Sequence, residues 1–328
     1  MTPNAWVLLA AVALGDGANF DAWQPEPIAA RNQHPLSLLF LDLPVSGAAT
    51  LPEGHMEAAL QTTYSSISQS GFGTHDQAVF DGEFARAAAT LRWGAADALE
   101  LSVEVPIAYA SGGFLDHFIS EYHHTLGLPQ TVPEGVPNDF FEVRASRNGH
   151  EYFSVEPHDV SLGDVDLAAK VRLLSEESAP ITLAVRAGVE PPTGSISRGF
   201  GSDTWDAAVG VIAQRSVGDW TAFLDADVSI PDLFDQFDGP RPQPFVSISP
   251  ALRVELTASI GLVAELDFNS NVIPNSDISE LSRNQLQVDA GAEFRITKQT
   301  SLEVGFAEDL FKKTSPDVTG IAGIRVRF

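Results

Sequence analysis

The sequence has 328 residues, of which 44% are hydrophobic and 19% charged, with no cysteine and a formal net charge of -25. Carboxylates outnumber Lys and Arg by 44 to 19, which excludes a nucleic-acid partner because phosphate-binding surfaces need clustered basic side chains. The lack of cysteine excludes disulfides, a thiol nucleophile and a Cys-ligated metal.

The first residues have the pattern of a secretory signal. An apolar stretch from Ala5 to Leu14 is followed by the small residues Gly15 and Gly17, so residues 1–17 are predicted to be a signal peptide cleaved near Gly17. The basic residues that usually precede such a stretch are missing, which leaves a misplaced start codon or a buried first helix as alternatives. Residues 18–55 are expected to form a periplasmic N-terminal segment.

From residue 56 onward, apolar and polar residues alternate with a period of two, the pattern of β-strands with two different faces. In one stretch Val165, Leu167 and Val171 share one face, while Asp166 and Lys170 share the other. About twelve such segments occur, at residues 56–66, 79–93, 98–109, 162–174, 180–190, 204–215, 219–230, 244–254, 257–269, 285–297, 300–308 and 318–328.

The length of these segments indicates a membrane barrel. A tilted strand needs about 9–11 residues to cross a bilayer, whereas strands of soluble sheets average about 5–6. No run of 18 apolar residues follows the N-terminus, and the mean hydropathy of +0.02 fits a barrel with a polar lumen. A soluble β-sandwich is the alternative, but this many long apolar faces would overfill its core. Pro106 and Pro250 count against two of the strands, because proline cannot donate to a ladder.

The connections between the segments alternate between short turns and long loops rich in Gly, Pro, Ser, Asn and Asp. Bacterial outer-membrane barrels have short periplasmic turns and long extracellular loops. The sequence therefore predicts an all-β fold, a transmembrane antiparallel up-and-down β-barrel of about twelve strands over residues 56–328. We expect it to lie in the bacterial outer membrane, with lipid and lipopolysaccharide as partners and both chain ends in the periplasm.

Several motifs resemble known outer-membrane proteins. The final strand "IAGIRVRF" ends in Phe328 and resembles the terminal signal that such barrels present to the barrel-insertion machinery. The stretches "RNQHPLSLLF", "FLDHFISEYHHTLGLP" and "GVEPPTGSISRGFGSD" resemble a family of uncharacterised proteobacterial outer-membrane barrels. That family is similar to the barrels of the phenol meta-cleavage pathway, which also have a "PTG" turn followed by a "GFG" element. The resemblance implies a barrel that passes small, hydrophobic or aromatic solutes.

If the apolar faces meet lipid, the charged residues of the strands face the lumen. Alternating strand directions then place acidic residues in the extracellular half, namely Asp164, Asp166, Glu190, Asp227, Glu265, Asp267 and Asp289. Basic residues fall in the periplasmic half, namely Arg92, Lys170, Arg172, Arg253, Arg295, Arg325 and Arg327. This gradient of charge would act on charged permeants. The alternative is that the charges pair with one another in a plugged lumen.

The longest connection, residues 110–160, exceeds the length of a simple loop. Phe114, Phe118 and Tyr122 recur at four-residue spacing and predict a short helix folded into the mouth of the barrel as a constriction. On the same helix His117, Glu121 and His124 share one face, within reach of one zinc ion. Such residues are more often solvated, so neither a metal nor a cofactor is expected.

Three functions are compatible with these features. A channel for small solutes is the leading prediction. A lipid hydrolase is an alternative, because Ser111 and a group of histidines, His75, His117, His123 and His124, fall near the extracellular rim. A structural or adhesive surface protein with acidic loops is the third possibility.

Overall fold

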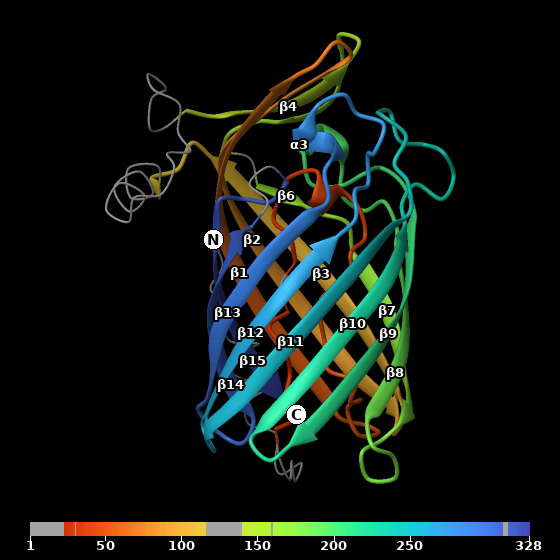
Figure 1. Cartoon of the computed structure of the whole chain (residues 1–328), viewed down its shortest axis with the longest axis vertical. Coiled ribbons are helices and arrows are strands. Elements are labelled where there is room, and N and C mark those ends of the chain that lie inside the picture. The colour runs from red at the N-terminus through yellow and green to blue at the C-terminus, as the bar shows by residue number, and fades with distance from the viewer. Residues whose placement is uncertain (1–22, 30, 116–139, 159, 311–313) are drawn as a thin grey trace, which may run out of the picture.

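The computed structural model describes residues 23–29, 31–115, 140–158, 160–310 and 314–328. Twelve antiparallel strands form a closed barrel, in the circular order β1-β15-β14-β13-β12-β11-β10-β9-β8-β7-β3-β2, because β2 pairs with both β1 and β3 (Figure 1). The predicted all-β barrel fold is therefore confirmed. Among the described residues no helix is long and apolar enough to cross a membrane.

The barrel strands coincide with the twelve alternating segments of the sequence. Their bounds are β1 (Met56–Phe72), β2 (Asp76–Ala96), β3 (Leu99–Ser111), β7 (Asp166–Leu174), β8 (Thr182–Glu190), β9 (Asp206–Val217), β10 (Trp220–Ile230), β11 (Phe245–Thr257), β12 (Ile260–Asn269), β13 (Gln285–Arg295), β14 (Thr300–Asp309) and β15 (Val318–Arg327). Apolar residues such as Leu167, Val209 and Leu252 are exposed on the outer face. Charged residues such as Asp166 and Arg253 are buried on the inner face, as a lipid-embedded barrel with a polar interior requires.

Two strands extend beyond the barrel wall at the end with the long connections, here called the outer mouth. β1 and β2 have 17 and 21 residues, more than the 9–11 or so that cross a bilayer. β2 also pairs with β4 (Glu142–Arg147), which forms a hairpin with β5 (His150–Val155) above the mouth (Figure 1). This hairpin lies within the stretch predicted as one long loop.

The wall is interrupted where β3 changes partners. β3 pairs with the short β6 (Val160–Leu162) at the outer mouth and with β7 lower down. Pro106 lies between the two pairings, where the Gly163 amide donates to the Pro106 carbonyl at 3.0 Å. Pro106 therefore lies at a break in the ladder, where its missing amide hydrogen is tolerated.

Residues 18–55 were expected to form a periplasmic N-terminal segment, and the structure describes them from residue 23 onward, apart from residue 30. Residues 23–55 apart from residue 30, here called the lumen segment, lie inside the barrel (Figure 1). Trp23 lies at the rim of short turns, where its indole donates to the Thr297 carbonyl at 3.3 Å. The segment rises to the 3₁₀-helix η1 (Ser37–Leu39) and descends again to β1. Most of its side chains are buried, so the segment fills much of the lumen.

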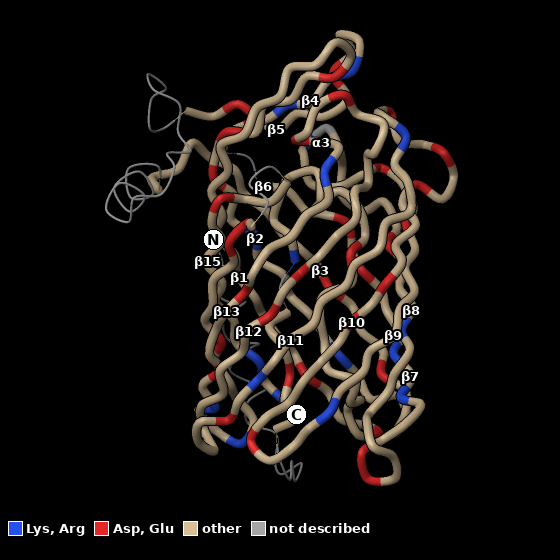
Figure 2. Tube along the Cα trace, in the orientation of Figure 1, with Lys and Arg blue, Asp and Glu red and all other residues tan. Residues whose placement is uncertain are grey.

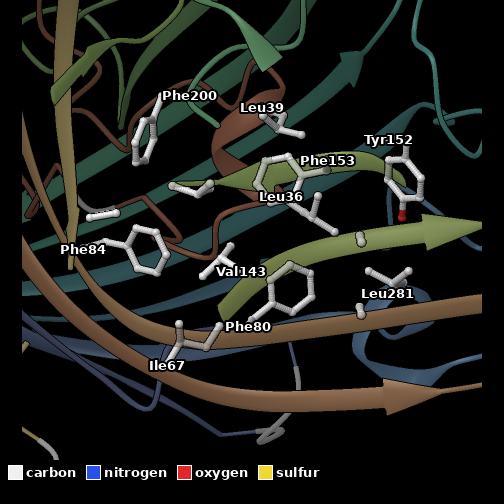
Figure 3. Close-up of a cluster of buried hydrophobic side chains, with 14 of the residues drawn as sticks. Leu36, Leu39, Ile67, Phe80, Phe84, Val143, Tyr152, Phe153, Phe200 and Leu281 are labelled. Carbon is white, nitrogen blue, oxygen red and sulfur yellow. The ribbon is translucent and has the colours of Figure 1, made fainter. Parts of the chain in front are cut away.

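An apolar cluster lies at the outer mouth. It joins the lumen segment, the β4–β5 hairpin, the loop that holds η2 (Ile196–Arg198) and the short helix α3 (Ser279–Ser282) to the inner face of β2 (Figure 3). We call it the outer cap; its buried members include Leu36, Leu39, Phe40, Phe80, Phe84, Val143, Tyr152, Phe153, Phe200 and Leu281. Figure 3 shows Phe80 and Phe153 facing each other across it.

Candidate functional site

The candidate site is the lumen, where basic side chains of the wall donate to backbone carbonyls of the lumen segment. The Arg186 guanidinium donates to the Pro44 carbonyl at 2.6 Å, and the Lys170 ammonium donates to the Gly47 carbonyl at 2.9 Å. Arg253 reaches the Glu26 carbonyl at 3.0 Å. These bonds satisfy buried carbonyls that have no sheet partner.

Acidic and amide side chains of the wall accept from the backbone N–H groups of the same segment. Asp206 accepts from Leu41 at 3.0 Å, and Asp225 accepts from Ser46 at 2.7 Å. Gln214 and Glu100 receive the Ala48 and Leu51 amides in the same way. The inner wall therefore binds an extended chain through its backbone, which explains why so many charges can be buried there.

The turn of the lumen segment near the outer mouth is made by the stretch "RNQH" at residues 31–34. Arg31 donates to the Phe40 carbonyl at 2.6 Å and lies 3.4 Å from Asp166 on the wall. The Asn32 amide reaches the Ser315 hydroxyl at 3.0 Å. His34 accepts from the Leu36 amide and meets the Phe80 ring edge to face, with ring centroids 4.6 Å apart. Each polar residue of this motif thus fixes the turn.

Lower in the lumen the charges form a dense ion-pair network. Arg92 lies within 2.9 Å of both Glu57 and Glu100 and 3.3 Å from Glu26 of the lumen segment. Lys170 shares Glu100 at 3.2 Å. On the opposite wall Arg253 and Glu293 are 2.5 Å apart, and Gly261 leaves room for the Arg253 guanidinium, which a side chain there would meet.

Six of the seven basic residues expected in the lumen pair with carboxylates of the inner wall. Most Lys and Arg positions of the barrel lie in the half that ends in short turns (Figure 2). The acidic partners of these basic residues lie at the same height of the barrel and were not identified from the sequence. The partners also occupy inward positions of the alternation; they are Glu57, Glu100, Glu255, Glu293 and Glu303. The positive half of the expected gradient is thereby offset by paired carboxylates. Arg172 differs from the others, because it lies at the rim and donates to the Asp97 carbonyl.

The acidic residues expected in the outer half are all buried: Asp164, Asp166, Glu190, Asp227, Glu265, Asp267 and Asp289. Asp166 pairs with Arg31 of the lumen segment, and two others are fixed by further partners. Asp227 is 2.5 Å from Arg186, and Asp164 lies in the wall break, where it accepts from the amides of Thr193, Gly194 and Ser202 at 2.7–2.8 Å. Asp164 therefore holds the "PTGSISRGFGS" loop rather than facing a permeant.

Replacing Asp164 with Ala is expected to release this loop, because three amides, one buried and two partly buried, lose a charged acceptor. We expect a local destabilisation of about 3 kcal/mol, since a hydrogen bond to a charged group contributes about 1.5–3 kcal/mol. Hydrogen exchange at Thr193, Gly194 and Ser202 should accelerate by about 100-fold or more. Asp203→Ala, which removes one exposed bond to Ile196, should change exchange much less; equal effects would contradict the assignment.

The predicted constriction helix falls mostly outside the described residues. Phe118 and Tyr122, with the possible metal ligands His117, Glu121 and His124, belong to residues 116–139. Phe114 is described and lies on the outer face of the wall beside Tyr64, 71% exposed, instead of in the mouth.

The histidine and serine that suggested a hydrolase are not brought together in the described residues. The His75 ring lies 3.0 Å from the Asn148 side-chain oxygen, and no contact joins it to Ser111. His123, the remaining candidate base, also belongs to residues 116–139.

A cavity of about 170 Å³ lies beside the lumen segment. Pro27, Leu43 and Val45 form its apolar side. Its polar side is formed by Arg31, Gln61, Arg86, Thr90, Arg92, Glu104 and Lys170. We call this cavity the chamber. Arg86 is held against Glu104 at 2.5 Å, so the chamber presents paired charges beside an apolar surface.

The chain terminus completes the wall next to the first strand. The Phe328 amide donates to the Met56 carbonyl at 2.9 Å, and the Met56 amide donates to the Phe328 carbonyl at 2.8 Å. Arg327 is 2.7 Å from Glu57 and stacks on the Trp23 ring. The last strand is thereby joined both to β1 and to the start of the lumen segment.

Comparison with known proteins agrees with this architecture. A family model described as "Protein of unknown function (DUF3187)" matches residues 9–328. Among solved structures, the COG4313 outer membrane channel from Pseudomonas putida F1 is similar at 15% identity and a TM-score of 0.54, over 86% of this chain and 98% of that one. The KdgM porin is similar at 10% identity and a TM-score of 0.45, over 82% and 99% of the two chains. No curated protein matches the sequence. These structural neighbours are channels and porins rather than enzymes.

Proposed function

The chain belongs to the DUF3187 family, and from the geometry of its lumen we propose that it is an outer-membrane channel for small solutes that the lumen segment holds closed. The chamber is the observation that carries this proposal. It lies inside a closed barrel and is bounded by a segment that pairs with no strand of the wall. Displacing such a segment opens a path without breaking any ladder of the barrel.

The proposed location is the bacterial outer membrane, with lipid and lipopolysaccharide around the wall. Support comes from the band of exposed apolar side chains on the barrel strands, which would be unfavourable in water. The terminal strand ending in Phe328 would be the part that the barrel-insertion machinery recognises.

The proposed solutes are small and either hydrophobic or aromatic. An apolar cavity of about 150 Å³ accommodates benzene, and the chamber has about 170 Å³. Pro27, Leu43 and Val45 would contact an apolar ring, while the paired charges opposite them leave room for one polar group on the solute. The resemblance to the phenol-pathway barrels supports the same class of solute.

Uptake into liposomes tests the function directly. Refolded protein should accelerate the entry of a monoaromatic alcohol over that of a neutral disaccharide, because the chamber is too small for the sugar. Val45→Trp, which fills the apolar side of the chamber, should reduce this entry several-fold, whereas Leu252→Trp on the outer face should not. Equal rates for protein-containing and empty liposomes would contradict the proposal.

A further inference from the structure

Three carboxylates meet on the inner face of β12 and β13, away from the chamber. Glu265, Asp267 and Asp289 each offer an oxygen within 4.8 Å of the others, and all three are buried. Glu265 and Asp289 are directly opposite in the strand register, a position in which like charges destabilise a sheet.

These three charges have no direct cationic partner among the residues that the structure describes. In the described part of the chain, none of the three carboxylates takes part in an ion pair. Arg31 and Arg186 line a small cavity beside Asp267, but Arg31 pairs with Asp166 and Arg186 is shared by Asp225 and Asp227. Glu57 and Glu293 lower in the lumen have arginine partners, which these three carboxylates lack among the described residues.

Glu265 provides a second, independent observation. Its side chain is only 2% exposed, yet both of its carboxylate oxygens lack a hydrogen-bond partner among the described residues. By contrast, the Gln287 side-chain amide donates hydrogen bonds to Asp267 at 3.4 Å and to Asp289 at 3.1 Å. A buried carboxylate without any donor is costly, and this one points into a group of further oxygen ligands.

We propose that Glu265, Asp267 and Asp289 bind one divalent cation in the lumen. Three carboxylates without His or Cys suit a hard ion, Ca²⁺ or Mg²⁺, rather than zinc. A cavity of about 10 Å³ adjoins Asp267, with Asp42, Ser247 and Ser249 on one part of its lining and Arg31 and Arg186 on another. It has about the space for one water ligand. The ion neutralises the facing carboxylates and stabilises the pairing of β12 with β13. This proposal does not depend on solute passage.

Calorimetric titration of the full chain, refolded in detergent and stripped with EDTA, tests the site. CaCl₂ and MgCl₂ are the probes. We expect one saturable site per chain for at least one of them, with a rise in the thermal unfolding temperature. Asp289→Asn and Glu265→Gln should each weaken binding at least tenfold. The same variants should make the metal-free protein more stable, because they remove repulsion, and this shows that they fold.

Glu308→Gln is the matched control, because Glu308 lies on the neighbouring strand β14 opposite Val288. Its side chain points to the other face of the wall from Asp289, so its binding isotherm should equal that of the wild type. The proposal is overturned if neither cation binds the wild type at millimolar concentration. It is equally overturned if binding is unchanged in Asp289→Asn, or if acidification alone gives all the stabilisation and added cation gives none.

Discussion

Replacing Phe80 with Ala is expected to raise the open probability of the proposed channel by two to three orders of magnitude. Phe80 is fully buried in the outer cap, where its ring contacts His34 of the lumen segment and Phe153 of the β4–β5 hairpin. Truncating a buried Phe costs about 3–5 kcal/mol. The side chain of Phe80 takes no part in the ladders of β2. The lost packing free energy therefore destabilises the closed state of the outer mouth and leaves the barrel wall intact.

Single-channel recording in planar bilayers measures this change. The unheated variant should keep the electrophoretic mobility of a folded barrel, which separates opening from misfolding. Phe306→Ala is the matched control, since Phe306 is 51% exposed on the outer face of β14. An unchanged open probability in Phe80→Ala would show that the outer cap does not close the pore.

Acidification is expected to open the channel through His34. Burial lowers the pKa of His34 to about 3 from an ordinary value of 6.5. The closed state therefore holds the neutral imidazole, whereas a displaced segment binds the proton near pH 6.5. His34 makes its full contribution to the stability of the closed state above pH 6.5, and this contribution is lost as the pH falls toward 3.

At pH 4.5, two units below the ordinary pKa, the predicted loss is about 2.7 kcal/mol, or about 100-fold in open probability. His34→Asn is the variant to compare, because an Asn oxygen can accept the Leu36 amide two residues on, as His34 does. Conductance of this variant should respond far less between pH 7 and pH 4.5. If both proteins open equally on acidification, carboxylates and not His34 control closure.

The barrel itself was predictable because its signal is local. Alternation along each strand identified all twelve barrel strands, and the contrast of short turns and long loops predicts their orientation. Even the two prolines find places that agree with their chemistry; Pro106 lies in the wall break, and the ladder between β11 and β12 has a gap at Pro250.

The lumen segment was not predictable, because its position depends on contacts that are distant in sequence. It contains prolines at residues 25, 27, 35, 44 and 52, so it shows no strand pattern. Its turn is fixed by pairs such as Arg31 with Asp166 and Asn32 with Ser315, which are separated by 135 and 283 residues.

The ion pairs of the lumen were not predictable from the sequence either. The alternation places Glu57, Glu100 and Arg92 on inward positions, and it could have indicated that acidic residues also occupy the periplasmic half. It cannot show which heights coincide across the barrel. Register and strand tilt decide that Arg92 meets Glu57 and Glu100 while Glu265 meets only other carboxylates.

The most direct test of a channel closed by its own N-terminal segment is to fasten the turn of that segment to the wall. The Gln285 amide on β13 lies 2.7 Å from the Ser37 hydroxyl in η1, and the chain has no other cysteine to interfere. In the double variant Ser37→Cys, Gln285→Cys, a short reversible thiol cross-linker should abolish conductance, and reduction should restore it. Each single variant should be insensitive to both reagents. Full conductance through the cross-linked protein would contradict the account.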